Sequence, residues 1–518
     1  MSVSAQNIVK QYLLDAETEL KNYNLEVDRL KARIRALEHK RRILKENTTK
    51  YRSLLAPIHR MPPEVLAEIF DFCCEEDFIC TDEDPTMITM TQVCGRWRQI
   101  GFATPRLWST IRLEIGSWWF PDEEFPPERS RKRVKHMVEL FTKCSKTVPL
   151  SLHLETLVNE DYAMLSDVQL VEALASLGCL PDNSARWRVL EINHTLLCRP
   201  KFQNIRGRLP KLARLVIHGE SNGFGTGSPV FSDCPSLTSL HIQAAHWFTN
   251  DFPMHQLQSL ILLNTYIAPV RRILRGCTTM SRLDLRWVGG FKDDPNPDKH
   301  DILPQVKSLL VTAEEEGEAS DIFKVLTLRS LTTLEIRRSQ TEGTEWESLD
   351  LGPLTDFLSR SSCMITSLTL DSLPLSNVEI GSLLRLTPTL TRLIVQESTQ
   401  TGTGDKIIAT SFLRPFSYLN IADPLLPALK DLSFIIHHHH TSNQELEALV
   451  DMIASRAPDC HDPAVTAVAC LDSFTLVIMG EDEDEVDITV FSGPLQCFRA
   501  TGLTIDISFR EIDQSESD

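Results

Sequence analysis

The segment Leu237-Thr-Ser-Leu-His-Ile242 decides the fold, because its form recurs along the chain. The form is an apolar residue, two variable residues, Leu, one variable residue and a second apolar residue. Most copies lie about 20 to 26 residues apart, a period found in repeat proteins. Alternating apolar residues are typical of a short β-strand with one buried face. Ten such segments begin at Trp187, Leu212, Leu237, Leu257, Met280, Val306, Leu331, Ile365, Leu390 and Leu429.

This recurrence indicates an α/β repeat protein, in which each unit buries its apolar face only by stacking on its neighbours. Further strands are expected at 148–154, 474–477 and 503–507, with helices or loops returning between strands. Residues 146–510 therefore resemble a leucine-rich-repeat solenoid. The repeats are degenerate, because the Asn or Cys usual just beyond each strand is mostly absent. The alternative is an unrelated α/β domain with many Leu-rich strands.

A second pattern lies upstream, in residues 58–108. It reads Met61-Pro-Pro-Glu-Val-Leu-Ala-Glu-Ile-Phe70, then Val93-Cys-Gly-Arg-Trp97, then Pro105-Arg-Leu-Trp108. The paired prolines suit a helix entry, and the carboxylate after them suits the positive end of the helix dipole. Apolar residues at helical spacing predict two helices. So short a module buries little core alone, and its spare apolar surface suits partner binding. The alternative is a helical hairpin inside a larger domain.

Taken in order, these blocks resemble an F-box, in particular the F-box-like proteins of mushroom-forming fungi. The resemblance implies that residues 56–112 dock on the SKP-type linker subunit of a cullin–RING ubiquitin ligase. The chain departs from the family at Met61, where Leu is usual, and in its long acidic insert from Glu75 to Met87. Carried onto this sequence, the docking residues are Pro62, Leu66, Ile69, Phe70, Val93 and Trp97.

The N-terminal residues 6–47 carry an apolar heptad pattern, which predicts a coiled-coil helix over 1–52 that Pro57 stops. One set of apolar positions is Leu13, Leu20, Val27 and Ile34, and the other is Ala16, Tyr23, Leu30, Leu37 and Leu44. So narrow a stripe needs a partner, because packing supplies most helical stability. We expect a homodimer, and the alternative is packing on the protein's own body. The basic cluster at 40–42 is interpreted as solvated helix surface.

Charge and composition limit the classes of partner. Residues 1–60 carry 13 basic and 7 acidic groups, or +6, so the remainder of a chain of net charge −18 carries −24. An acidic body disfavours nucleic acid. The chain contains no run of 18 apolar residues, so no membrane span is predicted, and no secretory signal is visible. Thirteen cysteines without a Cys-x-x-Cys pair indicate reduced thiols, so we expect a cytoplasmic and/or nuclear protein.

The segments that flank the repeats are less regular. Residues 113–145 are interpreted as a linker that leads into a helix at 134–143. The basic run Arg129–Arg133 is either the solvated start of this helix or a nuclear import signal. Residues 511–518 form an acidic tail.

Several motifs that suggest chemistry have simpler interpretations. Adjacent imidazoles rarely converge on one ion, so His437–His440 is interpreted as a polar strand end or loop and not a metal site. The glycine-rich segments 222–227 and 401–404 lack the Lys-Ser/Thr and the strand–helix context of a phosphate-binding loop. The acidic run 481–485 is interpreted as a solvated hairpin tip. We therefore expect no metal, no cofactor and no catalytic residue.

Together the resemblances imply the substrate-recognition subunit of an SCF-type ubiquitin ligase, which transfers nothing itself. The F-box-like module would dock on the linker and cullin complex, and the repeats would hold an unidentified target protein. Outward strand positions such as His241, Glu335 and Thr369 are candidate target contacts. The alternative is a non-degradative interaction scaffold, and an enzyme with a site on the repeats is a third, weaker hypothesis.

Overall fold

The computed structural model divides the chain into two compact units. We call residues 1–75 and 90–103 the helical unit, and residues 76–89 and 104–518 the sheet unit. No helix in the described part of the chain is long and apolar enough to cross a membrane. The structure describes residues 3–74, 78–79, 84–115, 127–156, 179–193, 204–219, 229–243, 252–291, 299–339, 349–398, 407–417, 425–437, 442–458, 468–480 and 488–511.

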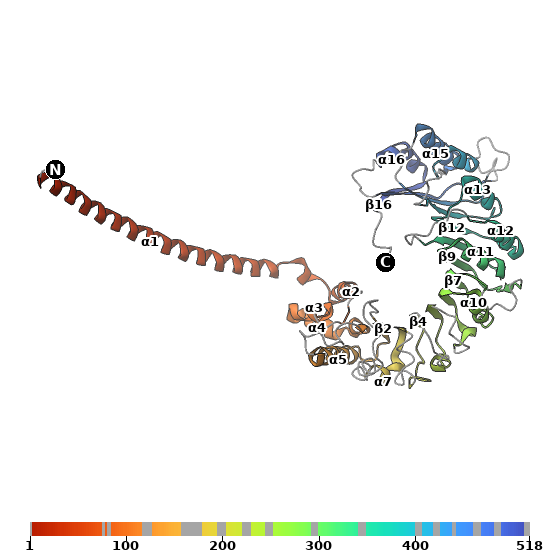
Figure 1. The fold of residues 1–518 in the computed structure, drawn as a ribbon, viewed down its shortest axis with the longest axis horizontal. Helices are drawn as coiled ribbons and strands as arrows, with labels where there is room; N and C mark the ends of the chain where they lie inside the picture. Colours follow the sequence, from red (N-terminus) through yellow and green to blue (C-terminus); the bar gives the residue numbers. More distant parts are fainter. Residues whose placement is uncertain are drawn as a thin grey trace. The chain divides into compact units, whose positions relative to one another are not determined.

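The helical unit opens with α1, a helix of 52 residues from Val3 to Leu54 (Figure 1). A short 3-10 helix, η1 (Pro57–Arg60), follows, and then α2 (Pro63–Cys73) and α4 (Gly95–Ala103). Between the last two lies α3 (Thr86–Val93), which begins in the sheet unit and ends in the helical unit. The predicted long N-terminal helix is therefore confirmed.

Prolines and one arginine set these helix boundaries. α1 ends three residues before Pro57, which cannot continue a helix, and Pro63 opens α2 with Glu64 in its first turn. The guanidinium of Arg96 on α4 donates to the carbonyl oxygens of Ile58 and Met61. These hydrogen bonds link α4 to η1 and to the residue that follows it.

The sheet unit is built on 14 parallel strands whose order in the sheet is their order in the chain. The strands are β1 (Thr110–Ile115), β2 (Leu150–Thr156), β3 (Trp187–Asn193), β4 (Arg214–His218), β5 (Ser239–Gln243), β6 (Ser259–Thr265), β7 (Arg282–Val288), β9 (Ser308–Ala313), β11 (Thr333–Arg338), β12 (Ser367–Asp371), β13 (Arg392–Gln396), β14 (Asp431–His437), β15 (Ser473–Gly480) and β16 (Thr504–Glu511). A separate two-stranded sheet pairs β8 (Asp301–Ile302) with β10 (Leu326–Thr327).

The register places the same repeat position of successive strands side by side. Leu215 lies between Leu190 and Leu240, and the row continues through Leu260 and Leu283. All five are fully buried, and burying one leucine side chain contributes about 1.5–3 kcal/mol. The apolar residues of the repeat therefore form continuous buried rows, while the residues between them alternate onto the opposite face.

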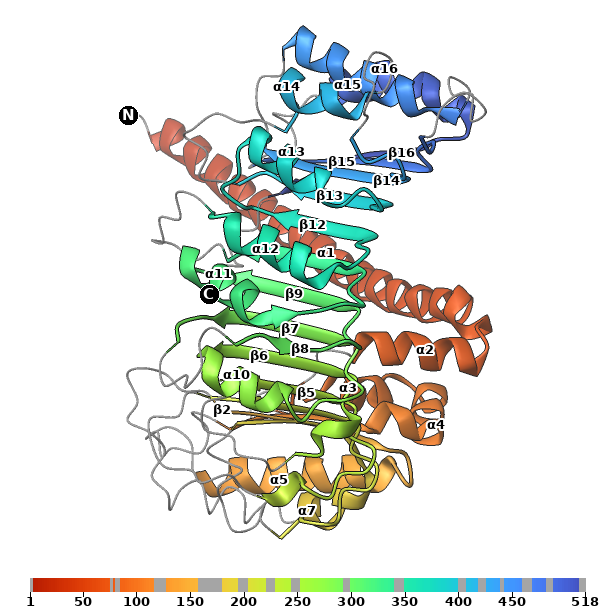
Figure 2. The same cartoon turned by 90° about the vertical axis from the view of Figure 1, so that its right-hand side faces the viewer.

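Short helices connect the strands, and Figures 1 and 2 show α10 to α15 along one face of the sheet. α13 and α15 start at serine capping boxes, in which Ser376 and Glu379, and Ser442 and Glu445, accept from each other's backbone N–H. The connecting helices are α5 (Pro127–Cys144), η2 (Pro105–Trp108), α7 (Cys179–Asp182), η4 (Ser184–Arg186), η5 (Pro229–Phe231), η7 (Met254–Gln256), α10 (Ile267–Leu274), α11 (Glu316–Val325), α12 (Gly352–Ser361), α13 (Asn377–Arg385), α14 (Thr410–Leu413), η8 (Arg414–Phe416), α15 (Asn443–Arg456), α16 (Thr489–Leu495) and η11 (Gln496–Thr501).

All ten recurring segments form strands of the sheet, which confirms the α/β fold class. One strand of the sheet is not among those predicted, because β1 precedes the segment 148–154. β1 also alternates, but it directly follows Trp108, so the sequence pattern assigns it to the F-box-like module. Ile79, from the acidic insert, adds a bridge to Leu113 of β1 and is buried there.

The remaining differences concern helix ends and segments outside the description. α5 begins at Pro127 and not at Val134, so the basic run Arg129–Arg133 lies within the helix. The residues 222–227, 401–404, 438–440, 481–485 and 512–518, for which loops or a tail are predicted, lie outside the described residues.

Candidate functional site

The six candidate docking residues separate into two groups in the helical unit. Leu66 and Phe70 of α2 are buried, with exposed fractions of 0% and 1%, and Trp97 of α4 is half-buried. The Trp97 and Phe70 rings lie against each other with centroids 4.9 Å apart. These three residues hold the unit together, so they support a docking surface without forming it. Pro62, Ile69 and Val93 are exposed.

The exposed face of α2 carries an apolar stripe that we call the α2 face, made of Val65, Ile69 and Phe72. These residues follow one another at i, i+4 and i+7, which places them on one side of a helix. Their exposed fractions are 42%, 38% and 79%. A contiguous exposed apolar surface is a mark of a protein–protein contact site. Val93 of α3 and Phe102 of α4 add exposed apolar side chains within the same unit.

Sequence reasoning finds only part of this stripe. Val65 appears in the predicted apolar face of the helix, but Phe72 does not, because the motif that carries the F-box resemblance ends at Phe70. The signal that finds Phe72 is its spacing of three from Ile69 and seven from Val65. It becomes interpretable only once Leu66 and Phe70 are known to face inward.

The solvent-side face of the sheet carries a histidine–glutamate cluster on three adjacent strands. His153 Nδ1 on β2 donates to one carboxylate oxygen of Glu191 on β3, and His218 Nε2 on β4 donates to the other, both at 2.6 Å. These hydrogen bonds hold the pKa of Glu191 well below its ordinary value, although partial burial opposes them. Glu191 is thus a fixed anion bridging two imidazoles.

His241 on β5 extends this cluster along the sheet. Its ring lies edge-on to the ring of His218, with centroids 5.8 Å apart. Burial is the main cause that lowers the pKa of His241 to about 4, and the nearby His218, Arg286 and Arg214 add to it against the opposing charge of Asp284. The Nε2 atom of His241 is buried and has no hydrogen-bond partner. His241 is therefore neutral near pH 7.

Farther along the same face, carboxylates pair with arginines. Arg286 binds both carboxylate oxygens of the buried Asp284 on β7, at 3.0 and 2.9 Å. Arg337 on β11 donates from two guanidinium nitrogens to one carboxylate oxygen of Glu335, and its Nε lies 3.8 Å from a carboxylate oxygen of Asp371 on β12. The outward positions His241, Glu335 and Thr369 are all partly exposed, as expected for candidate target contacts. These groups place charges of both signs on this part of the face.

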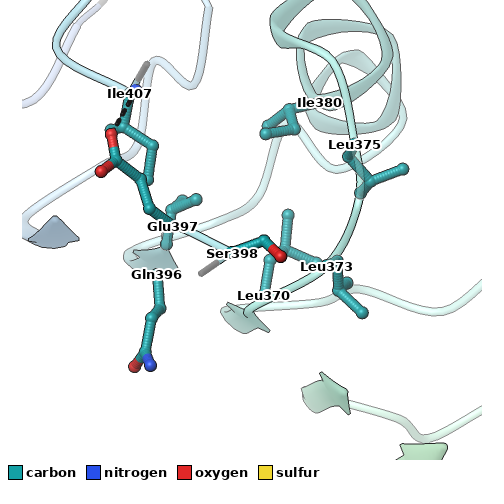
Figure 3. Close-up of a pocket in the computed structure, with 9 residues that line it drawn as sticks. Leu370, Leu373, Leu375, Ile380, Gln396, Glu397, Ser398 and Ile407 are labelled. Carbon is teal, nitrogen blue, oxygen red and sulfur yellow. Dashed lines mark hydrogen bonds between the residues drawn. The ribbon is translucent and has the colours of Figure 1, made fainter. Parts of the chain in front are cut away.

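One small cavity lies beside the ends of β12 and β13, lined by apolar residues and by Gln396, Glu397 and Ser398 (Figure 3). Its volume of about 20 Å³ is enough for roughly one water molecule. The carboxylate of Glu397 accepts hydrogen bonds from the backbone N–H of Ile407 at 2.8 Å and of His437 at 2.9 Å. Glu397 thus orders the chain after β13, and the cavity is too small for a substrate.

Among the described residues, no group of three or more His, Cys, Asp or Glu residues has a geometry that could hold a metal ion. Burial raises the pKa of the Cys234 and Cys277 thiols to about 12, so neither is a nucleophile at neutral pH. Buried inert thiols are consistent with the interpretation of reduced structural cysteines.

The sequence matches no protein-family model, and no curated protein aligns with it significantly. The F-box and leucine-rich-repeat resemblances therefore remain interpretations that rest on the residues and geometry described above.

Proposed function

We propose that this chain is the non-catalytic substrate-recognition subunit of an SCF-type ubiquitin ligase. The observation that carries the proposal is the α2 face, because it presents apolar side chains to solvent directly after the Pro62-Pro63 helix entry. The helical unit docks on an SKP-type linker protein through this face, together with Val93. The linker in turn connects it to the cullin.

The internal contacts of the helical unit favour a preformed docking surface. Phe70 and Trp97 fix α2 against α4, and Arg96 fixes the start of α4 to the η1 segment. A rigid face loses little conformational entropy on binding, so more of its burial energy appears as affinity. Phe72 is the most exposed apolar residue of α2 and the natural central anchor of such an interface.

We infer that the sheet unit is a leucine-rich-repeat solenoid, and its strand order supports this. Each strand pairs with the strands of the preceding and following repeats, and the repeated leucines stack in register. In such a fold the solvent-side strand positions form one long binding surface. The target protein binds there, over the histidine–glutamate cluster and the Arg–carboxylate pairs. Their mixed charge favours a polar target surface.

The mechanism under this proposal is one of proximity. The chain holds its target on the same complex as a ubiquitin-charged enzyme, so that a bimolecular transfer becomes effectively intramolecular. No residue of this chain takes part in the covalent steps. We therefore expect substitutions on the sheet face to change which targets are modified, and substitutions on the α2 face to abolish modification of all of them.

The test is binding of the purified full chain to a purified linker–cullin complex, with Ile69→Asp/Phe72→Asp as the docking variant. Both residues are exposed, so the variant should fold normally by circular dichroism. The matched control is Met364→Asp/Val378→Asp, two apolar residues of the sheet unit that are also exposed. We expect at least a 100-fold loss of affinity for the docking variant, and none for the control. Equal binding by both variants, or no binding by the wild type, would overturn the proposal.

The alternative, a non-degradative scaffold, uses the same surfaces and is separated by a pull-down of the wild-type chain from cell lysate, in which the linker and the cullin are detected separately. Under that alternative the chain either ignores the ligase or retains the linker without the cullin. Recovery of the cullin with the wild-type chain supports the receptor function.

A further inference from the structure

The helix α1 exposes an apolar stripe along its whole length. The side chains at the first heptad set, position a, include Leu13, Leu20, Val27 and Ile34, with exposed fractions of 45% to 60%. Those at the second set, position d, include Tyr23, Leu30, Leu37 and Leu44, with exposed fractions of 50% to 68%. All of these side chains are therefore exposed in the single chain. A stripe of this regularity is a surface for another helix.

We propose that α1 pairs with α1 of a second copy of the chain, as a parallel, in-register, two-stranded coiled coil. The residue types at the centre of the helix favour this arrangement over others. Position a holds the β-branched Val27 and Ile34, and position d holds Leu30 and Leu37. β-Branched residues at a combined with Leu at d favour parallel dimers over trimers and tetramers.

Charges beside these same layers complement each other in the parallel register. In a parallel dimer, position g of one helix faces position e of the next heptad on the partner. Glu26 then faces Lys31, and Arg33 faces Glu38, each pair occurring twice in the symmetric dimer. Within one helix Glu26 lies 3.8 Å from Arg29, and Lys31 lies 3.9 Å from Asp28. Exposed pairs of this kind are weak, so they compete little with the contacts of the dimer.

The C-terminal third of α1 is less suited to pairing. Arg41 occupies an a position, where the two copies face each other, and Lys40 would face Lys45 of the partner. Both contacts place like charges together. We infer that the tightly paired segment runs from about Leu13 to Glu38 and that the helices separate beyond it. A parallel dimer with separated ends leaves two copies of the following units at one end of the coil, which gives a receptor of valency two.

The first experiment measures the mass of the full chain by sedimentation equilibrium. We expect twice the 58.7 kDa of one chain for the wild type. Leu30→Glu/Leu37→Glu places charges in the seam and should give monomers. The matched control is Leu14→Glu/Leu25→Glu, which makes the same change at exposed positions off the seam. We expect the control to remain dimeric, and a monomeric wild type overturns the proposal.

The second experiment tests the orientation by reversing charges. One variant carries Glu26→Lys/Arg33→Glu, and the other carries Lys31→Glu/Glu38→Lys. In the parallel register, a homodimer of either variant places like charges at each g–e contact. A mixed dimer of the two variants restores opposite charges at every one of these contacts. We therefore expect weakened homodimers and a preferred mixed dimer. An antiparallel coil pairs g with g and e with e, so it shows no such preference and overturns the parallel register.

This inference is independent of the docking proposal. Leu30→Glu/Leu37→Glu should retain the affinity of each chain for the linker, while Ile69→Asp/Phe72→Asp should remain dimeric. Loss of dimerisation and loss of linker binding are therefore observed separately, so a failure of one proposal is distinguishable from a failure of the other.

Discussion

The indole of Trp97 lies against the phenyl ring of Phe70 at a centroid distance of 4.9 Å and an interplanar angle of 54°. The contact joins α4 to α2 across two sequence blocks that an insert separates. Because Phe70 is buried and Trp97 is half-buried, the pair fixes the orientation of α2 from within. The exposed α2 face depends on this internal contact for its shape.

Phe70→Ala should therefore destabilise the chain by about 3–5 kcal/mol, the usual cost of removing a buried aromatic side chain. The measurement is urea unfolding monitored by far-ultraviolet circular dichroism, a signal that does not depend on Trp97. A double-mutant cycle with Trp97→Leu should give a coupling energy of about 0.5–1.5 kcal/mol for the ring contact. Additive effects of the two substitutions would show that the rings do not stabilise each other.

His241 should make the stability of the sheet unit sensitive to mild acid. Its folded-state pKa of about 4 lies below the ordinary value of 6.5, so the unfolded chain takes up the proton first. The contribution of His241 to the free energy of unfolding is therefore fully present above pH 6.5 and is lost progressively as the pH falls toward 4.

The check compares the melting temperatures of wild type and His241→Gln from pH 7 to pH 4. We expect the loss of stability over this interval to be smaller in the variant. Thr369→Gln, a change at a non-titrating position on the same face, should keep the wild-type slope. Identical slopes for wild type and His241→Gln would contradict the assignment.

Glu191 should add a second loss of stability at lower pH. The hydrogen bonds from His153 and His218 depress its pKa below the ordinary value, so its contribution is present above about pH 4.3 and is lost as the pH falls further. Glu191→Gln keeps the size of the side chain but removes the charge. Its stability curve should be flatter than that of the wild type below pH 4.3, when unfolding is followed by circular dichroism.

The sequence predicts the strands better than it predicts the surfaces. Strand positions follow from local alternation, which requires no knowledge of the rest of the chain. By contrast, α2 has apolar residues on both sides, so periodicity alone cannot decide that Leu66 faces inward and Ile69 outward. The Glu191 cluster joins residues 38 and 27 positions away along the chain. Only the register of β2, β3 and β4 brings them together, and the sequence specifies that register through the sheet as a whole.

Glu397 offers a test of how one buried carboxylate stabilises the sheet unit. Its exposed fraction is 7%, and its two oxygens accept from the backbone N–H groups of Ile407 and His437. Removing the carboxylate leaves two N–H groups without this acceptor, and each costs about 1–3 kcal/mol when buried. Glu397→Ala should therefore lower stability by at least about 2 kcal/mol, and Gln396→Ala, at the adjacent half-buried position, should cost much less.

Amide hydrogen exchange gives the sharper readout, because the Ile407 and His437 amides should lose protection in Glu397→Ala while the amides of β5 keep theirs. Uniform loss of protection across the sheet would instead indicate global destabilisation, and unchanged protection at both amides would show that the carboxylate does not order this segment.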